Sequence, residues 1–99
     1  MIIREWRGWA DEAEAYPAHF RTAVLPQLRQ VPGFLGAYLS RRSIGDKIEY
    51  LVLTKWASMD SIRAFAGGDF DKAVVEPGAR AALADFDSYV QLYEVIEEI

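Results

Sequence analysis

The chain begins with a stretch in which side chains of different character alternate. Ile2, Arg4 and Trp6 form one set over residues 2–9, and the residues between them form the other set. A period of two is typical of a β-strand, because successive side chains of a strand point to opposite faces. We therefore expect a first strand over residues 2–9, with Arg4 on the same face as Trp6.

A helix with one buried stripe is expected after this strand. Asp11 is a suitable N-cap, since its carboxylate can accept hydrogen bonds from free backbone N–H groups. Pro17 and Pro26 lack a backbone N–H and predict bends or a broken first turn, and Pro32-Gly33 ends the helix. Apolar residues at helical spacing make up the stripe: Tyr16, Phe20, Val24, Leu28 and Val31.

Two further strands are predicted to form a hairpin. They cover residues 34–42 and 47–56, and a short turn over residues 43–46 joins them. Both faces of the strand over residues 47–56 carry apolar residues, so both faces of the sheet need cover. The two sets are Tyr50, Val52, Thr54 and Trp56 on one face, and Leu51 and Leu53 on the other.

The second half of the chain predicts more helix and a final strand. Ser58 is a good cap for a helix that Gly67-Gly68 ends. Short helices are expected over residues 70–75 and 79–83, because Pro77-Gly78 divides that stretch. Residues 88–96 alternate again and predict the last strand.

This order of elements predicts one α+β domain over residues 1–99. Strand, helix, strand, strand, helix, strand closes most simply as a ferredoxin-like split βαβ fold, with a four-stranded antiparallel sheet and helices on one face. The opposite face of the sheet then needs cover. Because 52% of the residues are hydrophobic, we expect a homodimer in which a partner sheet covers that face.

Charge and composition narrow the classes of partner. The formal net charge of −4 repels a nucleic-acid backbone, so no nucleic-acid partner is expected. The chain has no cysteine, which excludes disulfides and cysteine metal sites. No apolar stretch has the length of an export signal or a membrane span, so we expect a soluble, cytoplasmic protein with no membrane partner.

Three stretches of the sequence resemble the antibiotic biosynthesis monooxygenase (ABM) domains. They are residues 32–37, 53–58 and 65–75, and the resemblance covers nearly the whole chain. It implies a dimeric α+β barrel in which each subunit has a pocket between sheet and helices. Characterised members of this family oxidise polycyclic phenolic compounds with molecular oxygen and no metal or flavin, and others degrade haem.

The sequence departs from the haem-degrading branch at positions that matter. Those relatives place a histidine ligand in the helix after the third strand, where this chain reads Ala73-Val74-Val75, and a tryptophan where this chain has Phe65. The sequence also departs from the branch that it resembles more closely, the small dimeric α+β barrel proteins, in which a histidine is expected just before the tyrosine of the last strand; this chain reads Gln91-Leu92-Tyr93. We therefore expect no haem and no other cofactor or metal.

Two polar residues are candidates for catalysis. His19 is the single histidine, and a neutral imidazole near pH 7 can exchange a proton with a phenolic substrate; the alternative is a partly exposed helix residue. Arg4 can bind a phenolate or carboxylate and lower the pKa of a substrate hydroxyl. The alternative for Arg4 is a salt bridge to a carboxylate on a neighbouring strand, from Glu5, Glu49 or Glu94.

Aromatic residues are candidates for the wall of the pocket. Trp6, Tyr50, Trp56 and Phe65 would form an apolar wall that binds a flat ligand and excludes water. The alternative is ordinary packing in the core or at a dimer interface.

The sequence favours a cofactor-independent monooxygenase of the ABM type that acts on a small aromatic or quinol-like molecule. Two alternatives stay open: a non-catalytic binding or structural module, and an isomerase or lyase on the same fold. A pocket of ~300 Å³ or more with Arg4 or His19 pointing into it would favour an enzyme, whereas a filled interior would favour the module.

Overall fold

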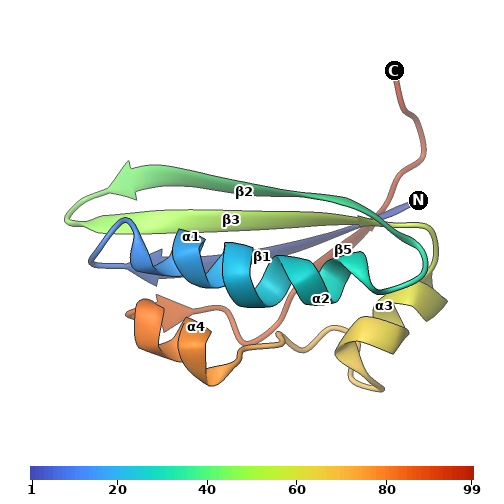
Figure 1. Cartoon of the computed structure of the whole chain (residues 1–99). Coiled ribbons are helices and arrows are strands. Elements are labelled where there is room, and N and C mark those ends of the chain that lie inside the picture. Colours follow the sequence, from blue (N-terminus) through green and yellow to red (C-terminus); the bar gives the residue numbers. More distant parts are fainter.

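An antiparallel sheet with a helical layer on one face forms the body of the protein (Figure 1), and the computed structural model describes residues 1–99. The central strand, β1, pairs with β3 along one edge and with the short strands β4 and β5 along the other, and β2 lies outside β3. The predicted α+β fold is thus confirmed, with five strands where four were expected. The strands are β1 Ile2–Ala10, β2 Phe34–Ile44, β3 Lys47–Trp56, β4 Asp85–Phe86 and β5 Gln91–Glu94.

The register between β1 and β3 decides which side chains face the helices. Arg4 lies opposite Thr54, and Trp6 lies opposite Val52. All four of these residues are buried beneath the helical layer. The alternation in the sequence grouped these side chains into sets that share a face, and the structure shows that the set containing Arg4 is the one beneath the helices.

The first helical stretch is continuous but changes its winding in the middle. It runs through α1 (Ala15–His19), a π-helical turn η1 (Phe20–Val24) and α2 (Leu25–Arg29). The N–H of Leu25 bonds the carbonyl of Phe20, five residues earlier. Pro26 follows directly, and it has no N–H to offer the carbonyl four residues before it. Pro17 lies in the first turn of α1, where its missing N–H costs no hydrogen bond, and Pro26 follows the widened π-helical turn. The helix therefore continues through both prolines without a break.

The cap of this helix differs from the prediction. Asp11 does not cap it, because its carboxylate pairs with Lys47 at the far end of the hairpin. The Glu12 carboxylate accepts hydrogen bonds from the N–H groups of Glu14 and Ala15 instead, at 2.7 and 2.8 Å. Several acidic side chains compete for the free N–H groups here, and sequence spacing did not identify which one binds them.

The helix after β3 forms as predicted. α3 covers Met59–Ala66, and the Ser58 hydroxyl accepts the N–H of Ser61 at 3.3 Å. Gly67, at φ 85°, ends it in a left-handed conformation that glycine adopts without steric cost.

The predicted helix over residues 70–75 is wrong. Residues 67–76 have no regular helix and run beside the segment that leads into β5. Two backbone hydrogen bonds join them, from Ala73 N–H to the Ser88 carbonyl at 2.9 Å and from Val90 N–H to the Asp71 carbonyl at 2.7 Å. Glycines at one end and a proline at the other leave too few residues for a stable helix.

The elements near the C-terminus are also shifted from the prediction. α4 covers Pro77–Ala82, not residues 79–83, because proline is favoured at a first helical position, where no N–H is needed. The last strand is limited to Gln91–Glu94, and β4 was not predicted. None of the helices has the length and apolar character needed to cross a membrane.

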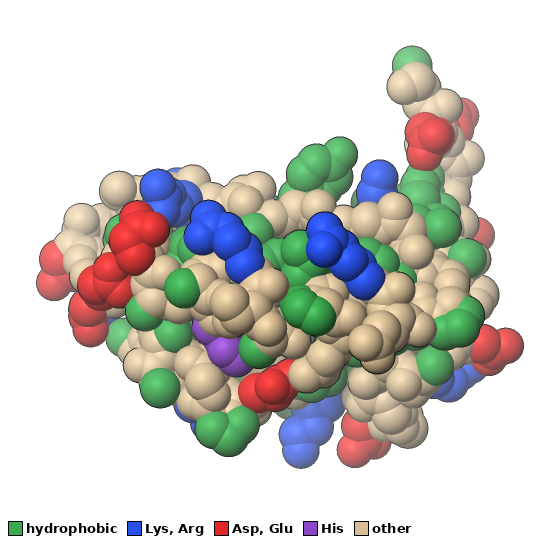
Figure 2. All heavy atoms as spheres, in the orientation of Figure 1, with side chains coloured by type: hydrophobic (Ala, Val, Ile, Leu, Met, Phe, Trp, Pro, Cys, Tyr) green, Lys and Arg blue, Asp and Glu red, His purple; other side chains and the backbone are tan.

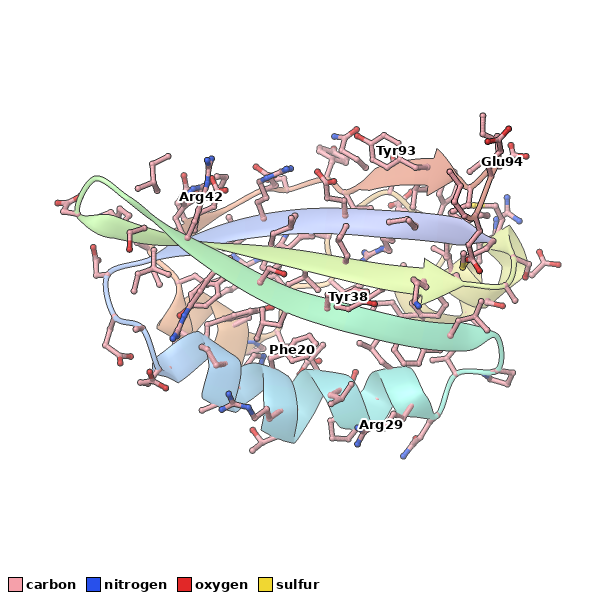
Figure 3. All side chains as sticks on the ribbon, turned by 90° about the horizontal axis from the view of Figure 1, so that it is seen from above. Phe20, Arg29, Tyr38, Arg42, Tyr93 and Glu94 are labelled. Atoms are coloured by element: carbon pink, nitrogen blue, oxygen red, sulfur yellow. The ribbon has the colours of Figure 1, made fainter.

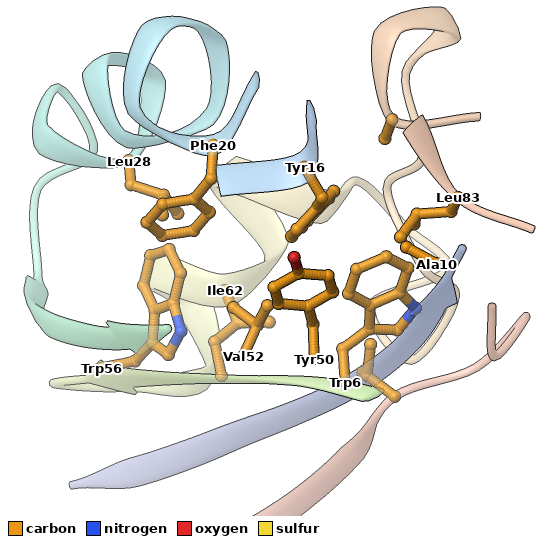
Figure 4. Packing of buried hydrophobic residues seen from close by; sticks show 12 residues of the cluster. Trp6, Ala10, Tyr16, Phe20, Leu28, Tyr50, Val52, Trp56, Ile62 and Leu83 are labelled. Atoms are coloured by element: carbon orange, nitrogen blue, oxygen red, sulfur yellow. The ribbon is translucent and has the colours of Figure 1, made fainter. Parts of the chain in front are cut away.

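The core lies between the sheet and the first helical stretch (Figure 4). Trp6, Tyr50 and Trp56 rise from the strands, and Phe20 and Leu28 pack onto them from the helix. All five are less than 9% exposed. This layer of large side chains fixes the distance between sheet and helix and leaves little empty space.

No helix covers the opposite face of the sheet. Figure 3 shows Tyr38 of β2 and Tyr93 of β5 on this side of the structure, and they are 59% and 52% exposed. Leu51 and Leu53 of β3 share the face and are half-buried. We call this surface, which is bounded by β2 and β5, the open face.

Two glycines with positive φ allow a test of how the hairpin is anchored to α3. Gly33 (φ 89°) leaves no room for a side chain, because a Cβ there would lie 2.0 Å from the Ser61 hydroxyl oxygen. Gly45 (φ 59°) has nothing within 4 Å. We expect Gly33→Ala to lower the free energy of unfolding by roughly 3 kcal/mol and Gly45→Ala by only about 1 kcal/mol. Urea unfolding of both variants measures this, and equal losses would contradict the role of the Ser61 contact.

Candidate functional site

A small cavity lies between the sheet and the helical layer. About 40 Å³ of it is open to the centre of a water molecule, which is room for a few waters and less than a drug-sized ligand needs. Figure 2 shows part of the single histidine, His19, in purple at the surface. The same residue lines the cavity. Strands, the first helical stretch and residues 65–79 contribute its lining: Arg4, Trp6, Tyr16, His19, Val24, Leu28, Val52, Thr54, Phe65, Val74, Glu76 and Ala79.

Arg4 is a buried cation without a carboxylate partner. It is 8% exposed, and its Nη2 donates to the Lys72 carbonyl at 3.3 Å while its Cζ lies 5.5 Å from the centre of the Phe65 ring. Its Nε is buried and has no hydrogen-bond partner. Burial lowers the pKa of Arg4 to about 10, so the guanidinium is still charged at neutral pH.

The salt-bridge alternative for Arg4 is wrong. Glu5 pairs with Arg7, and Glu49 accepts a hydrogen bond from Arg42 at 2.8 Å, both on the open face. Glu94, at the exposed edge of the sheet, makes no ion pair with Arg4 either. Glu5 and Glu49 are thus engaged on the open face, and Glu94 has no carboxylate oxygen within 4.0 Å of an Arg4 nitrogen.

His19 ends α1 and lines the cavity. Its Nε2 is buried and has no hydrogen-bond partner, and its ring lies 6.1 Å from that of Tyr16. Gly78 of α4 packs against the imidazole so closely that a Cβ there would lie 2.6 Å from Nδ1. The partly exposed position predicted as the alternative is correct for the residue as a whole, but the ring edge that carries Nε2 is turned inward.

The four aromatic candidates divide into two pairs. Trp6 and Phe65 line the cavity, whereas Tyr50 and Trp56 do not. Tyr50 donates its hydroxyl to the Ala13 carbonyl, and Trp56 donates its indole N–H to the Thr54 hydroxyl at 2.8 Å. Both are fully buried in the core, so the structure places them behind the cavity wall.

Sequence reasoning missed three polar residues of the cavity. Tyr16 is buried, which raises its pKa above the ordinary value and keeps its hydroxyl protonated. Thr54 lies opposite Arg4, and Glu76 accepts a hydrogen bond from Gln27 at 3.0 Å. Helical spacing to His19 pointed to Tyr16, and strand alternation pointed to Thr54. Glu76 lies in an irregular segment, where no periodicity indicates direction.

The donors of the cavity do not fit a haem or a protein-bound metal. No group of three His, Cys, Asp or Glu side chains comes together anywhere in the structure. Residues 70–75 contain no histidine, and His19 is the single histidine that lines the cavity. Its polar groups are instead suited to proton transfer and to the binding of an anion.

The cavity joins three chemical properties in one place. Arg4 supplies a positive charge, His19 supplies an imidazole nitrogen with no hydrogen-bond partner, and Tyr16 supplies a hydroxyl that stays protonated. Apolar side chains surround them, and electrostatic interactions are stronger in such surroundings than in water. The arrangement is suited to the formation and stabilisation of an organic anion.

Comparisons with known proteins agree on one family. A family model described as "Antibiotic biosynthesis monooxygenase" matches residues 1–77. No curated protein sequence matches the chain. A mutant of SnoaB, a cofactor-independent oxygenase from Streptomyces nogalater, is 20% identical, with a TM-score of 0.69 over 99% of this chain and 95% of that one.

A second solved structure, with a different chemistry, has the same fold. The heme-degrader MhuD from Mycobacterium tuberculosis, with two hemes bound in its active site, is 24% identical. Its TM-score is 0.58, over 100% of this chain and 99% of that one. At these identities the similarity establishes the fold, and it does not transfer either chemistry.

Replacement of Arg4 by an apolar residue of similar length tests the cost of the unpaired charge. We expect Arg4→Met to raise the free energy of unfolding by about 1 to 3 kcal/mol at pH 7, because a buried charge is removed along with one hydrogen bond. The folded-state pKa lies below the ordinary value, so the cost is fully present below about pH 10 and decreases above it. The gain should therefore be constant between about pH 6 and pH 9 in chemical unfolding.

Arg42→Met is the matched control, and its effect should have the opposite sign. It leaves the Glu49 carboxylate, which is 8% exposed, without its arginine partner. We expect this variant to be less stable than the wild type. If Arg4→Met were less stable than the wild type, Arg4 would stabilise the fold. That result would contradict our claim that its unpaired charge destabilises the folded protein.

Proposed function

Because the chain belongs to the antibiotic biosynthesis monooxygenase family, we propose that it is a cofactor-independent monooxygenase that acts on a small aromatic or quinol-like molecule. The observation that carries this proposal is the cavity, where a buried guanidinium without a carboxylate lies with an unpartnered imidazole nitrogen. Arg4 makes one hydrogen bond, to the Lys72 backbone carbonyl, and the Nε2 of His19 makes none. Both are the groups that ionisation of a phenolic substrate requires.

The reaction begins with removal of a proton from the substrate. The flat ring lies against Trp6 and Phe65, and the Nε2 of His19 accepts a proton from an acidic C–H or O–H group. Arg4 stabilises the carbanion or phenolate that results, which lowers the pKa of the substrate. Proximity and charge stabilisation are the whole contribution of the protein to this step.

Oxygen then reacts with the electron-rich anion. For an anthrone, the anion gives electrons to O₂ and a carbon–oxygen bond forms at the deprotonated carbon. The O–O bond breaks, one oxygen atom stays as the new carbonyl of the quinone, and the other leaves as water with the two hydrogens of the original CH₂ group. His19 returns the proton it took, so no external reductant is needed.

Binding of such a substrate requires the cavity to open. At 40 Å³ it does not hold a polycyclic ring. We propose that residues 67–76, which contribute Val74 and Glu76 to the wall, move outward when the substrate binds. This segment has no regular helix, and three of its apolar side chains pack only partly buried against the core. A few hydrogen bonds also tie it to the rest of the protein, among them the one between Arg4 and the Lys72 carbonyl. Such segments open at lower free energy than strands do.

We propose that two copies of the chain associate through the open face. Tyr38 and Tyr93 are more than half exposed there, and Leu51 and Leu53 lie between them on the same side. Exposed apolar side chains of this number are typical of an interface. The cavity lies on the opposite side of the sheet, so each copy would keep a complete site.

A non-catalytic binding or structural module is the second candidate. The small volume of the cavity and the filled core around Tyr50 and Trp56 favour it. In that case His19 and Arg4 would bind a ligand without changing it. The two candidates differ in turnover, and an isomerase or lyase would differ from both because it converts substrate without consuming oxygen.

The monooxygenase proposal predicts oxygen uptake without added metal or flavin. We expect purified protein to speed oxygen consumption with a member of a panel of anthrones and quinols, and an anthrone to give a quinone with one new oxygen atom from ¹⁸O₂. His19→Ala should lower kcat by about 100-fold or more, and Arg4→Ala by a similar factor. Gln30→Ala, exposed at the end of α2, should leave the rate unchanged.

Three outcomes of this assay would contradict the proposal. They are rates equal to the protein-free control across the panel, rates unchanged by His19→Ala and Arg4→Ala, and product formation without oxygen consumption. Binding with no turnover would support the module, and turnover under nitrogen would support an isomerase or lyase.

Association through the open face predicts a variant that remains a folded monomer. Leu53→Glu places a charge at the centre of that face, and a buried unpaired carboxylate is costly at an interface. Light scattering after gel filtration should give a dimer mass for the wild type and a monomer mass for Leu53→Glu. Gln30→Glu adds the same charge on the helical side and should stay dimeric. A monomeric wild type would contradict the proposal.

A further inference from the structure

We infer that the cavity takes an aromatic carboxylate, with the carboxylate bound by Arg4 before any chemistry occurs. This inference rests on the proposed function and narrows its substrate class. A quinol or anthrone becomes an anion only during the reaction. An acid that is ionised from the start would match the positive charge of the cavity in the resting state as well.

The first argument is charge. No carboxylate oxygen lies within 4.0 Å of an Arg4 nitrogen, and the side chain is 8% exposed. Glu76 is the single acidic residue of the cavity lining, and its carboxylate accepts a hydrogen bond from Gln27. Buried charges in proteins are normally paired or bind a charged ligand. The missing partner of Arg4 is therefore an anion from outside the chain.

The second argument is the shape of the free donors. The guanidinium has five N–H groups in one plane, and the hydrogen bond to the Lys72 carbonyl uses one of them. Its Nε–H is buried and free. A carboxylate has two oxygens in one plane and can accept two parallel hydrogen bonds from such a group, whereas a hydroxyl or amide oxygen is a weaker and narrower match.

The third argument is the wall around the charge. Phe65 lies beneath the guanidinium at 5.5 Å, and Trp6, Val24 and Val52 line the same cavity. A small inorganic anion would leave these apolar side chains without contact. Once residues 67–76 move outward, an aromatic ring attached to the carboxylate would cover these side chains and would leave the Nε2 of His19 free to act on the ring.

The test compares an acid with its neutral amide. 2-Naphthoate and 2-naphthamide have nearly the same shape, and calorimetry measures their affinities for wild-type protein. We expect 2-naphthoate to bind at least about tenfold more tightly, because it gains charged hydrogen bonds. Arg4→Met should abolish this preference, and Arg4→Lys should keep part of it. Acetate should bind no more tightly to the wild type than to Arg4→Met.

Several results would overturn the inference. They are equal affinities of the two compounds for the wild type, a preference for 2-naphthoate that survives Arg4→Met, no detectable binding of 2-naphthoate, and binding of acetate as tight as that of 2-naphthoate. Circular dichroism of Arg4→Met separates lost binding from lost folding, and this variant is expected to be the more stable one.

Failure of this inference is distinguishable from failure of the proposed function. 2-Naphthoate has no acidic ring C–H, so its binding is independent of oxygen chemistry. If the protein oxidises neutral anthrones but shows no preference for 2-naphthoate, the proposed monooxygenase activity is supported and the inferred carboxylate ligand is contradicted. If the protein binds 2-naphthoate with the expected preference but consumes no oxygen with any substrate, the inferred carboxylate ligand is supported and the proposed monooxygenase activity is contradicted.

Discussion

An arginine on the buried face of the central strand is the constraint on which the rest of the site depends. Because β1 alternates, Arg4 lies beneath the helical layer next to Trp6, whereas the carboxylates of Glu5 and Glu49 pair with other arginines on the open face. The guanidinium instead bonds the Lys72 carbonyl and lies over Phe65. One buried charge thus connects the sheet, the end of α3 and the irregular segment that closes the cavity. Residues 67–76 are therefore held in part by the same guanidinium that would bind the proposed anion.

The buried guanidinium of Arg4 lowers the stability of the folded protein but favours the binding of an anion. A charge that is held away from water without a carboxylate destabilises the folded protein, and an apolar side chain at the same position would not. Proteins commonly keep such residues where a ligand interacts with them. A bound anion would satisfy the guanidinium and would compete with the Lys72 carbonyl for its donors. Ligand binding and release of the 67–76 segment would then be two results of the same exchange of partners.

Periodicity in the sequence was sufficient for the parts of the structure that are regular. It identified β1, β2 and β3, the placement of Arg4 and Trp6 on one face of β1, and the Ser58 cap. It could not identify the partner of Arg4, which is set by register across strands and by a carbonyl far along the chain. Residues 70–75 were assigned to a helix because their composition permits one, but hydrogen bonds to residues 88 and 90 hold them extended. Glu76 could not be placed, because an irregular segment has no period.

The π-helical turn at Phe20–Val24 has a consequence for how this protein can change during evolution. The turn holds one more residue than an α-helical turn does, between His19 on one side and Leu28 on the other, and both line the cavity. Each residue of an α-helix rotates the chain by about 100°. Loss of a single residue within α1 or α2 would turn the rest of the helix by that angle. Loss of one residue from the π-helical turn would instead restore an α-helical turn and leave α2 directed at the cavity, because the π-helical turn spreads its extra residue over nearly the same rotation. The π-helical turn is therefore the place in this helix where a change of one residue in length disturbs the cavity least, and relatives that share the cavity can differ by one residue in the spacing between His19 and Leu28.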